Sequence, residues 1–520
     1  MPVGEHDFQL YDTTLRDGTQ QEGLSLSVGD KLAVARHLDS FGVSFIEGGW
    51  PGAIPKDTEF FRRARTDLDL RHAQPVAFGA TRRPELAVHN DPQVAALLAA
   101  DTPVVTLVAK ADSRHVDLAL RTTKTENLAM VRDTVRYLVR AGRRVFLDAE
   151  HFFDGFRTDR AYALSVVQVA AEAGAEVIVL CDTNGGTLPS ELGDVLAVTA
   201  STGVRLGIHC HDDSGCAVAN TLLAVDAGAS HVQVTAHGYG ERCGNANLFT
   251  VAANLVLKKG MPVVRDLSRL SEVAQAIGEI TAVPTPRSAP YVGSGAFTHK
   301  AGLHASAIRV DPSLYQHVEP DSVGNNMRTL VSDMAGRAAI ELKAKELGYD
   351  AAPEVLTRVT ARVKEMERLG YTFETATASF ELLLRSEMSP WDRPFEVESW
   401  RLTVGSGDCA EVSVRLRIGG EVIDATGSRP DPIEAMYEAL CRGLSSSYPD
   451  LERWRLTGCQ TWSLDGSLGK PAAIRAQVML RNDIEHCSTV RVDDDSLCAS
   501  WLALQDAVLF VLVCRCPAGV

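Results

Sequence analysis

The amino-acid sequence predicts an α/β protein with a (β/α)₈ barrel, then a helical subdomain, then a C-terminal α+β domain. Three observations lead to this prediction. Eight short apolar runs recur at roughly 30-residue spacing in the first half of the chain, as in a parallel barrel. Longer amphipathic stretches, typical of helices, separate these runs. After about residue 255 this alternation stops, and two passages of strand-like and then helical pattern occupy the end of the chain.

The eight apolar runs are short enough for buried strands. The candidate strands are Phe8–Asp12, Ser44–Gly48, Gln74–Phe78, Val104–Val108, Arg144–Asp148, Val177–Cys181, Arg205–His209 and His231–Thr235. Helices are expected between them, for example over Gly29–Phe41, Thr125–Ala141 and Ala161–Ala173. The alternative architecture is an open doubly wound sheet. No strand–GxGxxG–helix element favours a dinucleotide-binding fold.

The chain beyond the barrel has a different composition. Thr281–Gly302 is rich in Pro, Gly, Ser and Thr, which predicts a linker or an ordered loop region. A helical part is expected from about Asp333 to Arg385. Two similar β–α halves then predict a small α+β domain with an internal repeat. We therefore expect a barrel over residues 1–280, a linker and helical subdomain over 281–390, and the α+β domain over 391–520.

Length and composition restrict the class of protein. The chain has 520 residues, 45% of them hydrophobic, and 23% are charged, which is ordinary for a globular protein of two or three domains. A disordered chain, a fibrous repeat and a small disulfide scaffold are excluded. The formal net charge of −15 and the lack of a strongly basic segment argue against nucleic acid as a partner.

Cysteine usage and apolar segments bear on the compartment. The 11 Cys residues form no CxxC pair and have no disulfide-like rhythm, which fits a reducing cytoplasm. The N-terminal sequence has no apolar segment after a basic start, so no secretory signal is expected. The longest late apolar run, Ala507–Cys514, is far short of a membrane span. A cytoplasmic protein without a membrane partner is therefore expected.

In a (β/α)₈ barrel, catalytic groups gather just after the carboxyl ends of the strands. In this sequence those positions are rich in residues that bind metals or transfer protons. They are Arg16 and Asp17 after the first strand, Glu47 at the end of the second, Glu150 after the fifth, Asp182 and Thr183 after the sixth, His209 and His211 at the end of the seventh, and Glu241 and Asn245 after the eighth.

Two of these groups suggest a metal site. His209 and His211 are two positions apart on a strand, so their side chains project to one face and can chelate one divalent ion. Asp17 is the best candidate for a third ligand, since only the eighth strand separates its strand from theirs in a closed barrel. The alternatives are a pair of loop histidines bonded to backbone and, for Arg16 with Asp17, a surface ion pair. Gly18 favours a tight turn close to a ligand instead.

Four motifs together resemble a known family. They are LRDGTQ at Leu15–Gln20 followed by Lys31, LGIHCHDDSGCAVAN at Leu206–Asn220, GERCGNANL at Gly240–Leu248 and HKAGLHASA at His299–Ala307. In this order they resemble the signatures of the 2-isopropylmalate/homocitrate/citramalate synthase family, a metal-dependent, Claisen-condensing group with a TIM barrel. Three further stretches resemble its long bacterial, citramalate-forming members: Glu47–Asp57, Asp148–Phe156 and Cys181–Pro189. This likeness implies condensation of acetyl-CoA with pyruvate to (R)-citramalate and CoA, for isoleucine biosynthesis.

The resemblance also implies roles for individual residues. Asp17, His209 and His211 would hold a divalent metal (Mg, Mn or Zn), with Asn245 in or near its coordination shell. Arg16 would bind the oxo acid and stabilise the alkoxide that develops on its ketone oxygen, and Thr183 would bind its carboxylate. The acid–base candidates are Glu150, His304 and Tyr315.

Several of these residues have plainer alternatives. Glu150 could form a structural ion pair with His151, and Tyr315 could be an ordinary surface or core residue. Glu47 could position a metal-bound water or simply cap the strand. Two departures from the family pattern put metal and substrate preference in question: Asp212 stands where the family usually has Asn, and His237 could be a spare ligand or a loop residue.

The C-terminal domain resembles the allosteric dimer domain of the same family, chiefly over Gly427–Leu440. This implies a homodimer and isoleucine as effector, the alternative being an assembly domain without a ligand. Three other functions stay open on the sequence: 2-isopropylmalate synthase with 2-oxoisovalerate as acceptor, a C–C lyase or aldolase of the same barrel group, and a non-catalytic amino-acid sensor.

Overall fold

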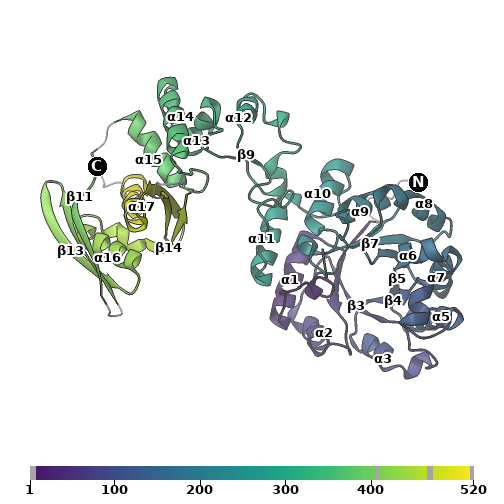
Figure 1. Ribbon diagram of the computed structural model, residues 1–520. Coiled ribbons are helices and arrows are strands. Elements are labelled where there is room, and N and C mark those ends of the chain that lie inside the picture. The colour runs from purple at the N-terminus through teal and green to yellow at the C-terminus, as the bar shows by residue number, and fades with distance from the viewer. Residues whose placement is uncertain (1–7, 390–391, 406–408, 465–471, 516–520) are drawn as a thin grey trace. The chain divides into compact units, whose positions relative to one another are not determined.

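The computed structural model describes residues 8–389, 392–405, 409–464 and 472–515 (Figure 1). Residues 1–7, where the sequence predicts no secretory signal, lie outside this description. The chain forms two compact units. One comprises Met1–Phe297 and Val318–Asn326, and the other Thr298–His317 and Met327–Val520.

The first unit is a closed barrel of eight parallel strands (Figure 1). Each strand pairs with the next, and β8 closes the barrel by pairing with β1. The strands are β1 Gln9–Asp12, β2 Phe45–Gly49, β3 Gln74–Ala80, β4 Val104–Lys110, β5 Arg144–Glu150, β6 Val177–Asp182, β7 Leu206–Cys210 and β8 His231–Val234. All eight predicted strands are confirmed, and the open-sheet alternative is wrong.

Helices surround the barrel strands and use local signals to begin and end. Ser27 and Asp30 form a capping box at the start of α1, and Gly42 ends it with a left-handed backbone. The helices of this unit are α1 Val28–Phe41, α2 Pro55–Asp67, α3 Pro92–Ala99, α4 Ser113–Leu118, α5 Lys124–Arg140, α6 Phe152–Thr158, α7 Arg160–Ala173, α8 Pro189–Ala200, α9 Ala217–Asp226, α10 Leu248–Lys259 and α11 Leu270–Thr281.

Two apolar cores hold the barrel. The larger lies between strands and helices and is mostly Val, Leu, Ala and Phe. A second, smaller cluster includes Tyr11, Phe45, Phe146 and Val179, whose side chains alternate along their strands with members of the larger core. The strands are therefore apolar on both faces, which is why they read as continuous apolar runs.

The second unit begins with short elements and then a helical subdomain. Its first elements are β9 Thr298–His299, α12 Gly302–Ile308 and β10 Arg328–Thr329. The helices α13 Arg337–Glu346, α14 Pro353–Arg368 and α15 Thr377–Met388 follow. The stretch Thr281–Gly302 is mostly loop, as its composition predicts.

The end of the chain consists of two similar halves, each a three-stranded antiparallel sheet with one helix. The first half contains β11 Glu396–Val404, β12 Ala410–Ile418, β13 Glu421–Arg429 and α16 Pro432–Leu444. The second contains β14 Arg455–Ser463, β15 Ile474–Arg481, β16 His486–Asp493 and α17 Ser496–Phe510. Every second residue of β12 is buried, because one sheet face packs on α16 and the other faces solvent.

Helix α15 belongs to two cores. Its residues Ala378 and Leu382 pack in the core of the two β–α halves. Phe380, Leu383 and Leu384 pack with α13 and α14 in the core of the helical subdomain. The last helix of the helical subdomain therefore also packs in the core of the C-terminal domain.

The described part of the chain contains one helical stretch that is long and apolar enough to cross a membrane, Ser496–Arg515. The apolar run Ala507–Cys514 underestimates the length of this stretch, which comprises all of α17 and a π-helical turn over Val511–Arg515. Of its apolar window, 67% is buried inside the structure. It packs against β15 and β16 as the core helix of its half.

Candidate metal centre and active site

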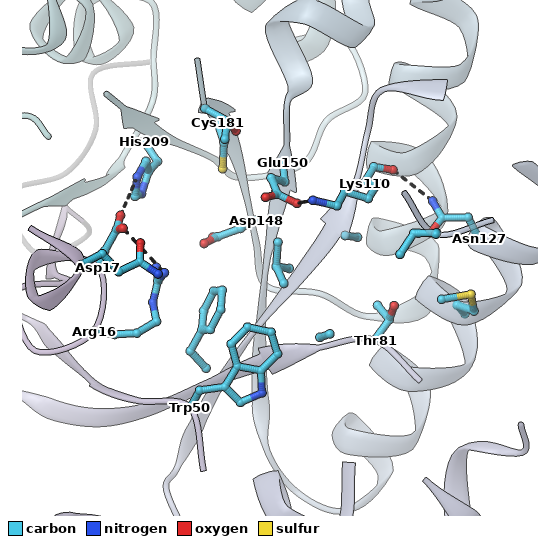
Figure 2. A pocket seen from close by; sticks show the side chains of 18 of the residues that line it. Arg16, Asp17, Trp50, Thr81, Lys110, Asn127, Asp148, Glu150, Cys181 and His209 are labelled. Carbon is cyan, nitrogen blue, oxygen red and sulfur yellow. Dashed lines mark hydrogen bonds and ion pairs between the residues drawn. The ribbon is translucent and has the colours of Figure 1, made fainter. Parts of the chain in front are cut away.

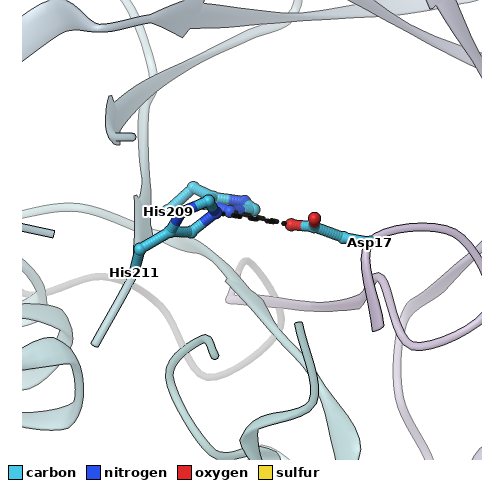
Figure 3. A group of neighbouring side chains, drawn as sticks. All are labelled: Asp17, His209 and His211. Carbon is cyan, nitrogen blue, oxygen red and sulfur yellow. Dashed lines mark ion pairs between the residues drawn. The ribbon is translucent and has the colours of Figure 1, made fainter. Parts of the chain in front are cut away.

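Asp17, His209 and His211 meet at the carboxyl ends of the barrel strands (Figure 3). Asp17 Oδ2 lies 3.2 Å from Nε2 of His209 and 3.6 Å from Nε2 of His211. One ligand atom from each residue lies within 4.8 Å of the others, and all three side chains are buried. The sequence prediction that these residues converge agrees with this geometry, and the alternative of two loop histidines bonded to backbone does not.

Asn245 faces His211 across an isolated bridge between their backbones. Its amide nitrogen donates to the Tyr239 carbonyl at 2.9 Å, whereas its Oδ1 is buried and has no partner among the described residues. Gly244 allows this turn: its φ is +88°, and a Cβ there would lie 2.0 Å from the Gly238 carbonyl oxygen. Two imidazoles, a carboxylate and an unpartnered amide oxygen form a donor set that suits a divalent cation.

Neighbouring charges of opposite sign shift the pKa values of Asp17 and His209. Burial alone would raise the pKa of Asp17, but the Arg16 guanidinium and the two imidazoles hold it well below its usual range. Burial alone would lower the pKa of His209, but the Asp17 carboxylate, with help from Asp148, raises it to about 9. The site therefore favours a negative charge on Asp17 and attracts positive charge beside it.

Asp148 is a buried carboxyl on β5 within the same cavity. Burial, and after it the Glu47 carboxylate, raises the pKa of Asp148 to about 7. Its Oδ1 accepts a hydrogen bond from Gln233 Nε2 at 2.8 Å. Gln233 Oε1 in turn lies 2.7 Å from His209 Nδ1.

Arg16 is held by Glu47 and Phe78. Its Nε pairs with Glu47, and its guanidinium carbon lies 3.9 Å from the centre of the Phe78 ring. Burial would lower the pKa of Arg16, but the Glu47 and Asp17 carboxylates raise it. Glu47 is fully buried and also accepts from the Tyr11 hydroxyl at 2.5 Å. Arg16 is thus a fixed cation in the cavity and not part of a surface ion pair, and the direct partners of Glu47 are Arg16 and Tyr11.

Glu150 pairs with Lys110 and not with His151. The two residues are register partners at the ends of the parallel strands β4 and β5. His151 turns away with a positive φ of 58° and stacks on His115, with ring centres 3.8 Å apart. The structural ion pair with His151 that the sequence leaves open is therefore wrong, while Glu150 itself lines the cavity.

The Thr183 hydroxyl oxygen accepts the His151 backbone N–H at 2.8 Å, so its hydrogen is left to donate. Arg242 fixes the loop that carries Thr183. Its guanidinium donates to the Thr183 carbonyl at 2.8 Å, pairs with both carboxylate oxygens of Asp213 and lies 2.7 Å from His211 Nδ1. Arg242 thereby ties together the loops after β6, β7 and β8.

Several of these groups line one cavity of about 510 Å³ (Figure 2). Figure 2 shows Asp17 and His209 at one side, and Lys110, Thr81 and Asn127 at the other, with Asp148 and Glu150 between them. Its lining includes Arg16, Asp17, Trp50, Phe78, Lys110, Asp148, Glu150, Cys181, Thr183, His209, His211 and Glu241. Asp182 instead binds the backbone and hydroxyl of Thr187.

His304 and Tyr315 lie in the second unit, His304 on α12 and Tyr315 shortly after it. Their rings stack with centres 4.1 Å apart, and Tyr315 is 40% exposed. The pair is therefore accessible to solvent at its tyrosine, and Tyr315 is not an ordinary core residue. A role for either residue at the barrel cavity stays a prediction.

The two departures from the family pattern have structural partners outside the metal site. Asp212 accepts the backbone N–H of Ala217 at 2.8 Å, at the start of α9. His237 Nε2 lies 2.8 Å from the Ala274 carbonyl, and its ring packs against Phe249. The spare-ligand interpretation of His237 is therefore wrong, and Asp212 acts at a helix start.

Sequence reasoning assigns no role to Lys110, Gln233, Asp148 or Arg242. A lysine at a strand end and an arginine in a loop look like ordinary solvent-facing residues. Gln233 is the one signal that could have been used, because an amide inside the apolar run of β8 must find a partner in the barrel. Which partner it finds depends on the register of β8 against β7, where Gln233 stands beside His209.

The chain matches three protein families in succession. Residues 7–277 match the HMGL-like family, residues 291–370 the homocitrate synthase post-HMGL domain-like family, and residues 374–512 the LeuA allosteric (dimerisation) domain. A protein of Streptomyces coelicolor named (R)-citramalate synthase is 54% identical over 98% of this chain and 97% of its own.

Relatives from distant bacteria carry the same name. (R)-citramalate synthases of Aquifex aeolicus and of a Synechocystis species are each 42% identical over 97% of this chain and cover 97% and 96% of those proteins. The HMGL-like match alone covers more than half of the chain. With three relatives aligned along nearly its whole length, the chain belongs to the (R)-citramalate synthase family of HMGL-like enzymes.

Proposed function

We propose that this chain condenses acetyl-CoA with pyruvate and hydrolyses the product thioester, which yields (R)-citramalate and CoA. The observation that carries this proposal is the 54% identity to an (R)-citramalate synthase over 98% of the chain. The enzyme is thus an acyltransferase whose acyl group becomes an alkyl group on transfer. Its product would serve isoleucine biosynthesis in the cytoplasm.

Asp17, His209 and His211 would hold a divalent cation, with the unpartnered Oδ1 of Asn245 as a fourth ligand. When bound, such an ion polarises the ketone of the oxo acid as a Lewis acid. A mixed nitrogen and oxygen donor set is compatible with Mg²⁺, Mn²⁺ or Zn²⁺. The Thr183 hydroxyl, still free to donate, would bind the oxo-acid carboxylate beside it.

Arg16 would stabilise the charge that develops during bond formation. As the acetyl methyl carbon attacks the ketone carbon, an electron pair moves onto the ketone oxygen. A guanidinium that is already fixed by Glu47 and Phe78 does not have to reorganise to donate to this oxygen. A stabilisation of this kind typically contributes about 10²–10³-fold to the rate.

Glu150 is the proposed base. Its carboxylate would take the proton from the acetyl methyl group, and the ion pair with Lys110 holds it at the cavity. His304 and Tyr315, from the second unit, would act with Glu150 in the proton transfers. Water then attacks the thioester carbonyl, the carbon–sulfur bond breaks, and the CoA thiol leaves.

The LeuA domain supports a homodimer, and we infer that isoleucine is its effector. A cavity of about 410 Å³ lies among the starts of α16 and α17 and strand β14. Its lining combines the carboxyl of Glu434, which suits an ammonium group, with Ile433 and Leu456, which suit an aliphatic side chain. Isothermal titration with isoleucine tests this, because a Glu434→Gln variant would lose binding while a domain that only assembles would bind none.

The reaction is tested by measuring CoA thiol release from acetyl-CoA across a panel of 2-oxo acids, with and without a chelator. We expect release with pyruvate that the chelator abolishes and added metal restores. Preference for 2-oxoisovalerate would indicate a 2-isopropylmalate synthase. No release with any oxo acid and added metal would contradict the proposal and leave a lyase or a non-catalytic sensor.

A further inference from the structure

A chain of two hydrogen bonds runs from His209 into the barrel. Gln233, on β8, is 1% exposed and lies beside His209 in the register of β7 and β8. Its Oε1 is 2.7 Å from His209 Nδ1, and its Nε2 donates to Asp148 Oδ1 at 2.8 Å. Figure 2 shows His209 and Asp148 at the same cavity. Both ends of the Gln233 amide are thus occupied by groups of the candidate site.

The contacts of Gln233 give the direction of these bonds. Its Nε2 donates to Asp148 Oδ1, so the NH₂ end of the amide faces Asp148. The carbonyl end then faces His209 and can only accept. His209 must therefore carry a hydrogen on Nδ1, so Nε2, which lies 3.2 Å from Asp17, is the ring nitrogen available to bind a cation.

We propose that Gln233, oriented by Asp148, is a positioning residue that fixes His209 in the tautomer able to bind a divalent cation through Nε2. The inference rests on the metal site of the proposed function. Partners of this kind behind metal-binding histidines set the ring orientation and the basicity of the ligand nitrogen. If the Gln233 amide were reversed, its NH₂ would donate to Nδ1, and the hydrogen would move to Nε2 and block the ligand position.

The same barrel contains a matched control. His231 Nδ1 lies 2.9 Å from Gln9 Oε1, where β8 and β1 begin. This is also a histidine–glutamine bond between neighbouring strands, but neither residue lines the cavity. Removing it perturbs the barrel in a similar way without touching the candidate ligands.

The experiment uses the full chain and measures the dissociation constant for Zn²⁺ by competition with a chromophoric chelator. We expect Gln233→Met to weaken Zn²⁺ binding by about 10–100-fold, since it removes both hydrogen bonds at similar volume. Gln9→Met should change the constant by less than about twofold, because nothing behind the ligands is altered. Far-UV circular dichroism confirms that each variant is folded.

A swap of the two polar partners tests the direction of the bonds. Asp148→Asn can present either an oxygen or an NH₂ group to Gln233, so both tautomers of His209 become accessible and Zn²⁺ binding weakens. Adding Gln233→Glu restores an obligatory acceptor for His209 Nδ1, because the carboxylate that it introduces accepts both from His209 and from the new amide on β5. We expect the double variant to regain most of the lost affinity.

Two results would overturn the inference: Zn²⁺ binding by folded Gln233→Met that equals the unsubstituted chain, or an equal loss in Gln9→Met. Failure of the proposed function is distinguishable from either. It would appear as absence of CoA release in the oxo-acid panel, whereas the Zn²⁺ constants are measured without any substrate.

Discussion

The Asp148 carboxyl should make the barrel less stable as pH rises. Its pKa is raised from 3.8 to about 7 in the folded chain, chiefly by burial. Between these values the folded state keeps a proton that the unfolded state has lost, so the free energy of unfolding falls with rising pH. A difference of about 3 pKa units corresponds to about 4 kcal/mol at about 1.4 kcal/mol per unit.

Asp148→Asn isolates this effect, because the amide cannot ionise and can still accept from Gln233. Relative to the variant, the unsubstituted chain should lose about 4 kcal/mol between pH 4 and pH 8, with little further change above. Asp12, whose pKa is also raised to about 7, titrates in both proteins, and its contribution cancels in the difference.

The measurement must report on the barrel alone, since a chain of two units need not unfold in one step. Urea titrations in chelator-containing buffers, read by a brief hydrogen-exchange pulse on peptides of β5 and β8, meet this requirement. A difference between the two proteins that is flat from pH 5 to pH 8, or that rises in favour of Asp148, would refute the reasoning.

Three other predictions concern the site and the second unit. Asp17→Asn should abolish metal-restored CoA release, since it removes the carboxylate that both imidazoles face, and added metal should not rescue it. Arg16→Lys should lower kcat by about 100-fold, because an ammonium cannot both pair with Glu47 and lie flat on Phe78; steady-state kinetics with pyruvate check this. Phe380→Ala should destabilise the second unit by about 3–5 kcal/mol, since its ring is fully buried, as measured by urea unfolding with peptide-resolved exchange.

The controls follow from the same structure. Asp30, which forms the capping box of α1 with Ser27 and does not line the cavity, provides a carboxylate whose change to Asn should leave metal dependence unaltered. Full activity in Arg16→Lys would show that a fixed guanidinium is not needed. For Phe380, exposed Leu369 is the comparison, and an equal loss on its change to Ala would contradict the packing argument.

The barrel could be predicted from the sequence because its strands are buried on both faces and stand out as apolar runs. Strands β13 and β14 are not distinguished by the sequence pattern, since largely exposed strands carry a weaker, alternating signal. The convergence of Asp17 with His209 and His211 followed from barrel closure. The ligand role of Asn245 came only from family resemblance, because an asparagine in a glycine-rich loop has no distinctive pattern of its own.

Side-chain contacts that depend on strand register could not be predicted from the sequence. Glu150 is adjacent to His151 in the chain, yet its partner is Lys110, which stands opposite it on β4. Likewise, Gln233 meets His209 because β7 and β8 align at that position. Such pairs join residues 24 to 40 positions apart, and a shift of one residue in either strand would separate them.

Helix α15 packs in two apolar cores, and this limits where domains of such chains can be exchanged between enzymes. The post-HMGL and LeuA family matches meet between residues 370 and 374, which would be the obvious place to join a barrel from one enzyme to a LeuA-type domain from another. A junction there would divide one apolar core between two parents, because Phe380, Leu383 and Leu384 complete the packing of α13 and α14. The exchangeable module therefore begins upstream of α13, and the helical subdomain has to be inherited together with the domain that follows it.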